Sequence, residues 1–165
     1  MQRLILMRHA KAEKTAPGGD IDRPLSKHGR DDALAMGRAL AERGLRPDMA
    51  LVSSARRTHQ TWDAVSESMG DVEAHLLPAL YNASADTLRR AIEAAEDEAG
   101  CLLLVAHNPG VHQLAVEYLI ESAASPSVLD KMSGGFPTGA AAVFTVDVAG
   151  RCAYEGFLTP HDLEK

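Results

Sequence analysis

The chain has 165 residues, 45% of them hydrophobic, and a formal net charge of −6. This length and composition suit one globular domain over residues 1–165, and the negative charge argues against a general nucleic-acid-binding protein. No apolar run approaches the roughly 18 residues of a transmembrane helix, so we expect a cytoplasmic protein without a membrane span.

The first predicted element is a short apolar run, Leu4 to Met7, followed directly by Arg8 and His9. Such a run is typical of a strand buried on both faces of a parallel sheet. Open α/β sheets bind ligands at the carboxyl ends of their strands. The sequence therefore places a potential anion clamp and a potential nucleophile at the edge of the sheet.

Helices and strands alternate along the rest of the chain, beginning after a Gly- and Pro-rich loop over residues 11–24. We expect helices over 26–44, 53–70 and 84–100, and strands over 49–52, 74–80 and 102–106, of which 74–80 is weaker and broken by Pro78. A further helix is expected to be capped by Asn108 with Pro109 as its first residue. Residues 121–138 look like a loop, and 140–146 and 152–158 look like a hairpin. The pattern predicts a three-layer α/β/α sandwich with a mostly parallel central sheet and an antiparallel C-terminal strand pair.

Basic residues follow three of the predicted strands. Arg8 and His9 follow the first strand, Arg56 and Arg57 come soon after the second, and His107 follows the strand over 102–106. Parallel strands bring these residues to one edge of the sheet. The guanidinium group of arginine matches the geometry of phosphate oxygens, and the helix after His107 adds free backbone amides. A phosphoryl group is therefore the expected ligand.

Four motifs, in content and order, resemble the histidine phosphatase superfamily, whose members have the phosphoglycerate mutase-like fold. The motifs are residues 7–10 (Met-Arg-His-Ala), residues 23–26 (Arg-Pro-Leu-Ser) with Gly29, residues 53–61 (Ser-Ser-Ala-Arg-Arg-Thr-His-Gln-Thr) and residues 105–108 (Val-Ala-His-Asn). Ala10 replaces the usual glycine, and residues 77–81 read Leu-Pro-Ala-Leu-Tyr. With these features the chain looks most like the short bacterial phosphohistidine phosphatases.

The resemblance implies a role for individual residues. His9 is the expected phosphate-accepting nucleophile, and Arg8, Arg57 and His107 are the expected phosphate pocket. Arg57, not Arg56, aligns with the family arginine, because it stands three residues before the Gln-Thr pair at 60–61. We add Arg23 and Asn108 to the residues expected to bind substrate.

The expected chemistry has two steps and needs neither a metal nor another cofactor. His9 attacks as a neutral imidazole, and water then hydrolyses the phosphohistidine. Cys101 and Cys152 are too few for a zinc site, and His107 and His112 are five residues apart, whereas a helical zinc pair is separated by four. We therefore predict no metal site.

A general acid is the missing part of the expected machinery. Mutase-like members of the family carry a glutamate after the third strand, but residues 77–82 hold no carboxylate. Glu13, Asp20, Asp22 and Asp86 are the candidates to approach the pocket, and Asp22, beside the Arg-Pro-Leu motif, is the first choice. The short chain also leaves little sequence for a lid, which suits a phosphohistidine on a protein surface.

Three functions remain open from the sequence. The first is a phosphatase for phosphohistidine on a signalling or phosphocarrier protein. The second is a phosphomonoesterase for a small metabolite, and the third is a phosphate-binding module without turnover. The missing acid and lid favour the first over the second, and the complete set of Arg8, His9, Arg57 and His107 argues against the third.

Overall fold

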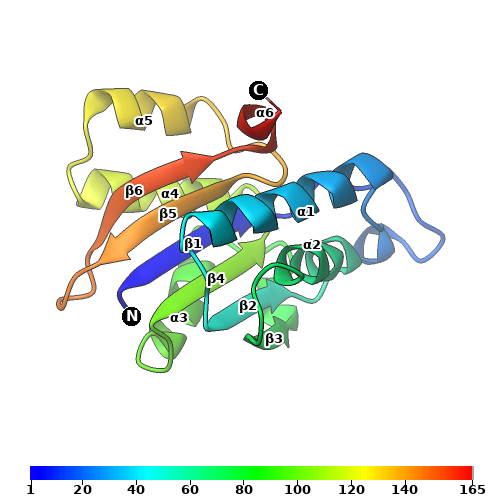
Figure 1. Ribbon diagram of the computed structural model, residues 1–165, viewed down its shortest axis with the longest axis horizontal. Coiled ribbons are helices and arrows are strands. Elements are labelled where there is room, and N and C mark those ends of the chain that lie inside the picture. The colour runs from blue at the N-terminus through cyan, green and yellow to red at the C-terminus, as the bar shows by residue number, and fades with distance from the viewer. Residues whose placement is uncertain (165) are drawn as a thin grey trace.

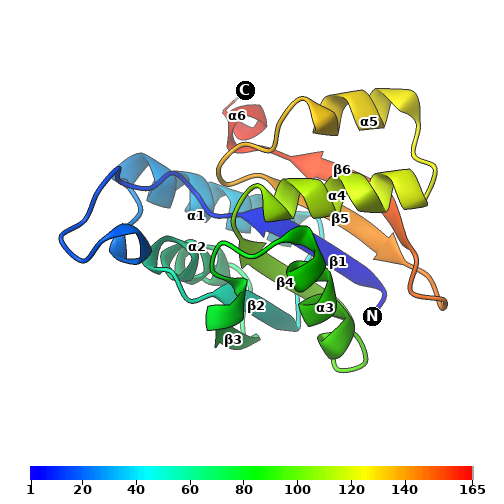
Figure 2. The ribbon, with the colours of Figure 1, turned by 180° about the vertical axis from the view of Figure 1, so that it is seen from behind.

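The computed structural model describes residues 1–164 and contains a six-stranded mixed sheet with helices on both faces (Figures 1 and 2). The strands are β1 (Arg3–Arg8), β2 (Met49–Ser53), β3 (Glu73–Leu77), β4 (Cys101–Ala106), β5 (Ala141–Val146) and β6 (Cys152–Leu158). Their order in the sheet is β3-β2-β4-β1-β5-β6. The pairs among β1 to β4 are parallel, and β5 and β6 each pair antiparallel to their neighbours, as predicted.

The helices form a layer on each side of the sheet. The layer in front in Figure 1 holds α1 (Lys27–Glu42), α2 (Arg56–Ser66) and α6 (Pro160–Leu163), and the layer in front in Figure 2 holds α3 (Ala85–Ala95), α4 (Gly110–Glu121) and α5 (Pro126–Ser133). Two short 3₁₀ turns, η1 (Asp20–Asp22) and η2 (Pro78–Leu80), lie in the connections. Within residues 1–164, no helix combines the length and hydropathy that crossing a membrane requires.

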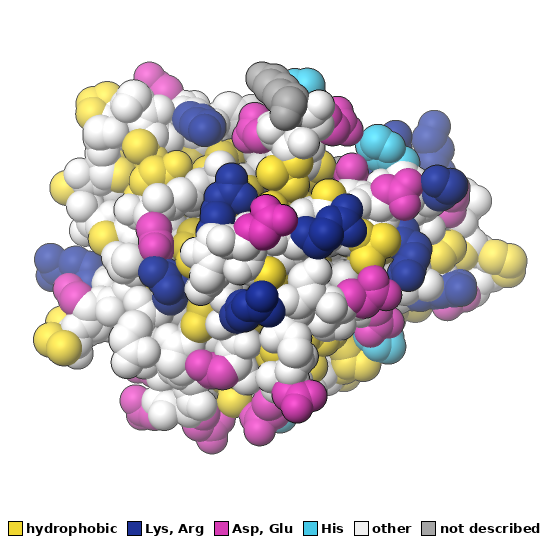
Figure 3. Space-filling model, viewed as in Figure 1, with side chains coloured by type: hydrophobic (Ala, Val, Ile, Leu, Met, Phe, Trp, Pro, Cys, Tyr) yellow, Lys and Arg dark blue, Asp and Glu magenta, His cyan; other side chains and the backbone are white. Residues whose placement is uncertain are grey.

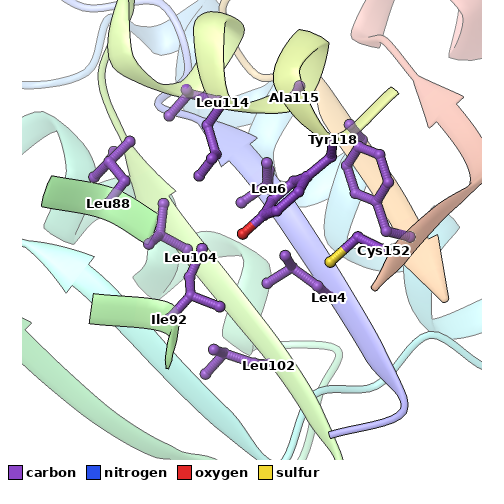
Figure 4. Packing of buried hydrophobic residues seen from close by; sticks show 14 of the residues in the cluster. Leu4, Leu6, Leu88, Ile92, Leu102, Leu104, Leu114, Ala115, Tyr118 and Cys152 are labelled. Carbon is purple, nitrogen blue, oxygen red and sulfur yellow. The ribbon is translucent and has the colours of Figure 1, made fainter. Parts of the chain in front are cut away.

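Alternate residues of the central strands enter two separate cores. Leu4 and Leu6 of β1 pack toward α3 and α4, whereas Ile5 and Met7 pack toward α1 and α2. Figure 4 shows the first of these cores, where β1 and β4 meet the two helices through Leu4, Leu6, Leu102, Leu104, Leu88, Ile92, Leu114 and Ala115. Burial on both faces explains why the strands are continuous apolar runs, and it fixes the ends of β1 and β4 rigidly in register.

Two expectations about local structure in the second half of the chain are wrong. Residues 126–133 form α5, not loop: Ser125 caps the helix by accepting from the Val128 amide, and Met132 is buried against α4. Serine and proline are common at the first positions of helices as well as in loops, so the Ser and Pro content of this segment does not distinguish the two. Asn108 also does not cap α4. Pro109 occupies the cap position, and the Asn108 side chain donates instead to the Phe136 carbonyl.

Candidate active site

The carboxyl ends of β1, β2 and β4 meet at one edge of the sheet, and a cavity of about 450 Å³ lies there. Its lining comprises Arg8, His9, Lys11, Ala12, Asp20, Arg23, Arg57, Asn82, His107, Asn108 and Thr138. The cavity thus brings together every residue assigned from the sequence to catalysis or substrate binding except Asp22. Four of the lining side chains are cationic, which suits an anionic ligand.

His9 is held as a neutral imidazole with one nitrogen free. Its side chain is buried, and Nδ1 lies 2.8 Å from the Ala10 carbonyl oxygen, to which it donates. That hydrogen bond leaves the lone pair on Nε2. Burial lowers the pKa of His9 to about 4, and the charges of Arg57 and Arg8 act in the same direction, against the hydrogen bond to Ala10. A neutral imidazole with a fixed ring is the form that can act as a nucleophile.

Helix α2 fixes the backbone beside His9. Thr61 Oγ1 accepts from the Ala10 amide at 3.0 Å and donates to the Arg57 carbonyl at 2.7 Å, so one hydroxyl joins the two segments. One residue earlier, Gln60 Oε1 accepts from the Leu25 amide at 2.7 Å. In the sequence analysis, this Gln-Thr pair served only to identify Arg57, not Arg56, as the family arginine. Its side chains in fact connect three of the four motifs.

Arg57 lies at the start of α2 and is almost completely buried. Its Nη1 donates to the Asp20 carbonyl at 2.8 Å, and its Nη2 lies 3.2 Å from Asp20 Oδ2 and 3.3 Å from His107 Nδ1. Arg56 is exposed, and its Nη1 lies 4.0 Å from Asp22 Oδ1. The two neighbouring arginines therefore face different surroundings, and only Arg57 lines the cavity.

His107 is also neutral and is oriented from both nitrogens. Nδ1 accepts from Arg57, so Nε2 carries the proton and donates to Ser53 Oγ at 2.7 Å. Burial lowers the pKa of His107 to about 3, with further lowering by His9 and Arg57. The rings of His9 and His107 lie 5.4 Å apart between centroids. Ser53, expected to help begin a helix, ends β2 and positions this histidine instead.

The Phe136 carbonyl, on the loop between α5 and β5, holds two further cavity residues. It accepts from Arg8 Nη1 at 3.1 Å and from Asn108 Nδ2 at 3.0 Å. The Phe136 carbonyl therefore fixes both Arg8 and Asn108 at the wall of the cavity. Arg8 Nε and Arg57 Nε are buried with no hydrogen-bond partner among residues 1–164.

Comparison with known proteins places this arrangement in a family. The model of the histidine phosphatase superfamily (branch 1) matches residues 4–100. The chain belongs to the histidine phosphatase superfamily. An uncharacterized protein of Mycobacterium tuberculosis is 32% identical over 160 residues, which cover 93% of this chain and 99% of that protein. A phosphoglycerate mutase of Thermobifida fusca that depends on 2,3-bisphosphoglycerate is 37% identical over 73 residues, 42% of this chain and 30% of the mutase.

Solved structures place this histidine phosphatase in the short, SixA-like branch. The candidate phosphohistidine phosphatase SixA from Agrobacterium tumefaciens is 31% identical, with a TM-score of 0.83 over 96% of this chain and 99% of that one. Membership of the superfamily supports phosphatase activity. The α/β fold and the superfamily predicted from the sequence are thereby confirmed.

Asp20, not Asp22, is the carboxylate that this histidine phosphatase brings to its cavity. The Tyr81 hydroxyl donates to Asp20 Oδ2, and with Arg57 and Arg23 it lowers the pKa of Asp20 to about 2. Asp22 points to Arg56 and does not line the cavity. No pattern in the loop distinguishes the two aspartates, because the 3₁₀ turn η1 decides which one faces Arg57.

Proposed function

We propose that this chain hydrolyses phosphohistidine on a protein, through a covalent phosphohistidine at His9 and without a metal ion. The observation that carries the proposal is the state of His9. Its imidazole is neutral, its Nδ1 is tied to the Ala10 carbonyl, and it lines a cavity together with Arg8 and Arg57. A free imidazole nitrogen beside fixed guanidinium groups suits attack on a bound phosphoryl group.

The reaction then has two displacements at phosphorus. Arg8 and Arg57 bind the phosphoryl oxygens, and the bound dianion lets His107 take a proton on Nδ1 and donate to the phosphoryl group as well. The lone pair of His9 Nε2 forms a P–N bond as the P–N bond to the substrate imidazole breaks. That imidazole leaves as a neutral ring because its other nitrogen already carries a proton. Water next forms a P–O bond and releases a proton to solvent, while the bond to His9 breaks and orthophosphate and unphosphorylated His9 result. Arg23 and Asn108 lie at the cavity wall, where they contact the phosphoryl group or its carrier.

Phosphohistidine is favoured as substrate because the described lining of the cavity offers no protonated carboxyl group to a poor leaving group. The one carboxylate among its described lining residues is Asp20, whose lowered pKa keeps it ionised at neutral pH. An alkoxide leaves slowly without a proton, and a positioned acid contributes about 10²–10⁴-fold to such a step. An imidazole has an unperturbed pKa of about 6.5 and can leave with a proton of its own. The similarity to the candidate phosphohistidine phosphatase from Agrobacterium tumefaciens supports the same substrate class.

A metal-free reaction is favoured by the donor set of the cavity. The described lining offers two histidines, one of which accepts from a guanidinium, and one carboxylate that is paired with arginines. Within residues 1–164, the side chains that could together hold an ion are those of His28 and Asp32 in α1 and of Glu164 directly after α6. None of the three lines the cavity.

A substrate panel assayed with a chelator present tests the proposal. We expect turnover of a phosphohistidine protein and of p-nitrophenyl phosphate, whose leaving group is activated, and catalytic efficiency at least about 100-fold lower on a sugar phosphate. Asp22→Asn should change none of these rates by more than about twofold, since Asp22 faces Arg56. Equal efficiency on the sugar phosphate would favour a metabolite phosphatase. Loss of all activity with the chelator, restored by one divalent ion, would contradict a metal-free reaction.

A further inference from the structure

The loop that carries Asp20 is a flap fastened at its base. We call residues 14–22 the flap. At its base, Ala12 and Leu25 form an isolated antiparallel bridge, the Glu13 amide donates to the Pro24 carbonyl at 2.8 Å, and Arg23 Nη1 donates to the Glu13 carbonyl at 2.9 Å. The two ends of the flap are thus held together where they leave the body of the protein.

The η1 turn of the flap is held over the cavity by polar contacts. None of the three residues of η1 is buried, and the Ile21 side chain is 45% exposed. The contacts that η1 makes with the cavity are those of Asp20: its carbonyl accepts from Arg57, and its carboxylate meets Arg57, Arg23 and the Tyr81 hydroxyl. Because no apolar side chain of η1 is buried, these contacts decide whether this part of the flap is closed.

The carboxylate of Asp20 uses donors that a phosphoryl group needs. Arg57 Nη2 lies 3.2 Å from Asp20 Oδ2, and Arg23 Nε lies 3.0 Å from Oδ1. Guanidinium forks bind carboxylate and phosphate with the same planar geometry. A phosphoryl dianion at Arg57 and an ionised Asp20 repel one another, so they compete for the same place.

From this geometry we propose that Asp20 is the resident anion of the phosphate pocket and a determinant of substrate choice. The inference rests on the proposed function, because it takes Arg57 to be a phosphate ligand. A phosphoryl group must displace the Asp20 carboxylate, and the apparent affinity of any anion falls by the fraction of molecules in which the flap is closed. Orthophosphate and small esters offer only the phosphoryl group. A protein substrate also makes contacts outside the cavity, which offset the cost of opening.

Calorimetric titration of the whole chain with orthophosphate tests this inference. Asp20→Asn removes the competing charge and should lower the dissociation constant of orthophosphate about three- to tenfold. Tyr81→Phe keeps the ring beside His107 but removes one donor to Asp20, so it should act in the same direction with a smaller change. Asp22→Asn is the matched control, because it removes the same charge from the same flap at a position that faces Arg56. Its orthophosphate affinity should stay near that of the parent.

Unchanged or weaker binding of orthophosphate by Asp20→Asn would overturn the inference, and so would an equal gain in Asp22→Asn. If Asp20→Asn fails to fold, Tyr81→Phe decides by the same criterion. Turnover of phosphohistidine protein is measured in parallel. If Asp20→Asn shows normal turnover and unchanged orthophosphate affinity, only the inference that Asp20 competes with phosphate is rejected. If neither turnover nor orthophosphate binding is found in any of the proteins, the proposed function is rejected too.

Discussion

Arg57 supplies the cavity with a planar fork, and its surroundings differ from those of Arg56 next to it. Arg57 is buried and hydrogen bonds through both terminal nitrogens, whereas Arg56 is exposed. A lysine keeps the charge but loses the fork. We predict that Arg57→Lys lowers kcat/KM on p-nitrophenyl phosphate about 100-fold, which is the scale of losing one preorganised donor to a phosphoryl transition state.

Arg56→Lys is the matched control for that measurement. It should change kcat/KM by less than about twofold, since surface ion pairs contribute little. Equal losses in the two variants would show that the register chosen for Arg57 is wrong.

Two buried histidines also set how the protein responds to pH. The pKa of His9 is lowered to about 4 and that of His107 to about 3, whereas in the unfolded chain both return to about 6.5. Below pH 6.5 the unfolded chain therefore binds more protons than the folded one, so stability falls as pH falls. Each group contributes a slope of up to about 1.4 kcal/mol per pH unit between its two pKa values.

The prediction is a decline in the free energy of unfolding between pH 7 and pH 5, measured by urea titration. His107→Asn should make the decline shallower, because one of the two titrating groups is gone. Identical slopes in the variant and the parent protein would contradict the buried, neutral state of His107.

At the scale of elements, α1 meets the segment after β1 so closely that only glycine fits at position 29. A Cβ at Gly29 would lie 1.9 Å from the Lys11 carbonyl oxygen, which also accepts from the Ser26 amide and hydroxyl. Lys11 lines the cavity, so this contact joins the helix start to the active site. In the sequence, Gly29 was only one residue of a family motif. The close contact with Lys11 explains why this position requires glycine.

We predict that Gly29→Ala destabilises the protein by about 1–3 kcal/mol, the usual cost of overpacking, and lowers activity through displacement of Lys11. Denaturant unfolding measures the change. Gly134→Ala is the matched control, since its nearest contacts to a new Cβ are 3.5 Å away and its φ of −67° suits alanine. A stability loss in Gly29→Ala no larger than in the control would argue against the close contact.

At the scale of the whole molecule, the sheet made most of the site predictable. Arg8 ends β1, and His9 and His107 directly follow β1 and β4. Parallel order alone brings the ends of those strands together. The same reasoning failed for Asp20 and the Phe136 carbonyl, which lie in connections, and for the Ser53 side chain at the end of β2. They contribute through long-range hydrogen bonds, which hydrophobic periodicity does not encode.

The direct test of the account is to locate the phosphoryl group on the enzyme during turnover. The protein is mixed with a phosphohistidine protein, quenched in alkali and mapped by mass spectrometry. We expect an acid-labile, alkali-stable phosphoryl group on His9, and we expect His9→Ala to lose both the label and the turnover. A phosphoryl group on another residue, or turnover that persists in His9→Ala, would contradict the assignment of His9 as the nucleophile.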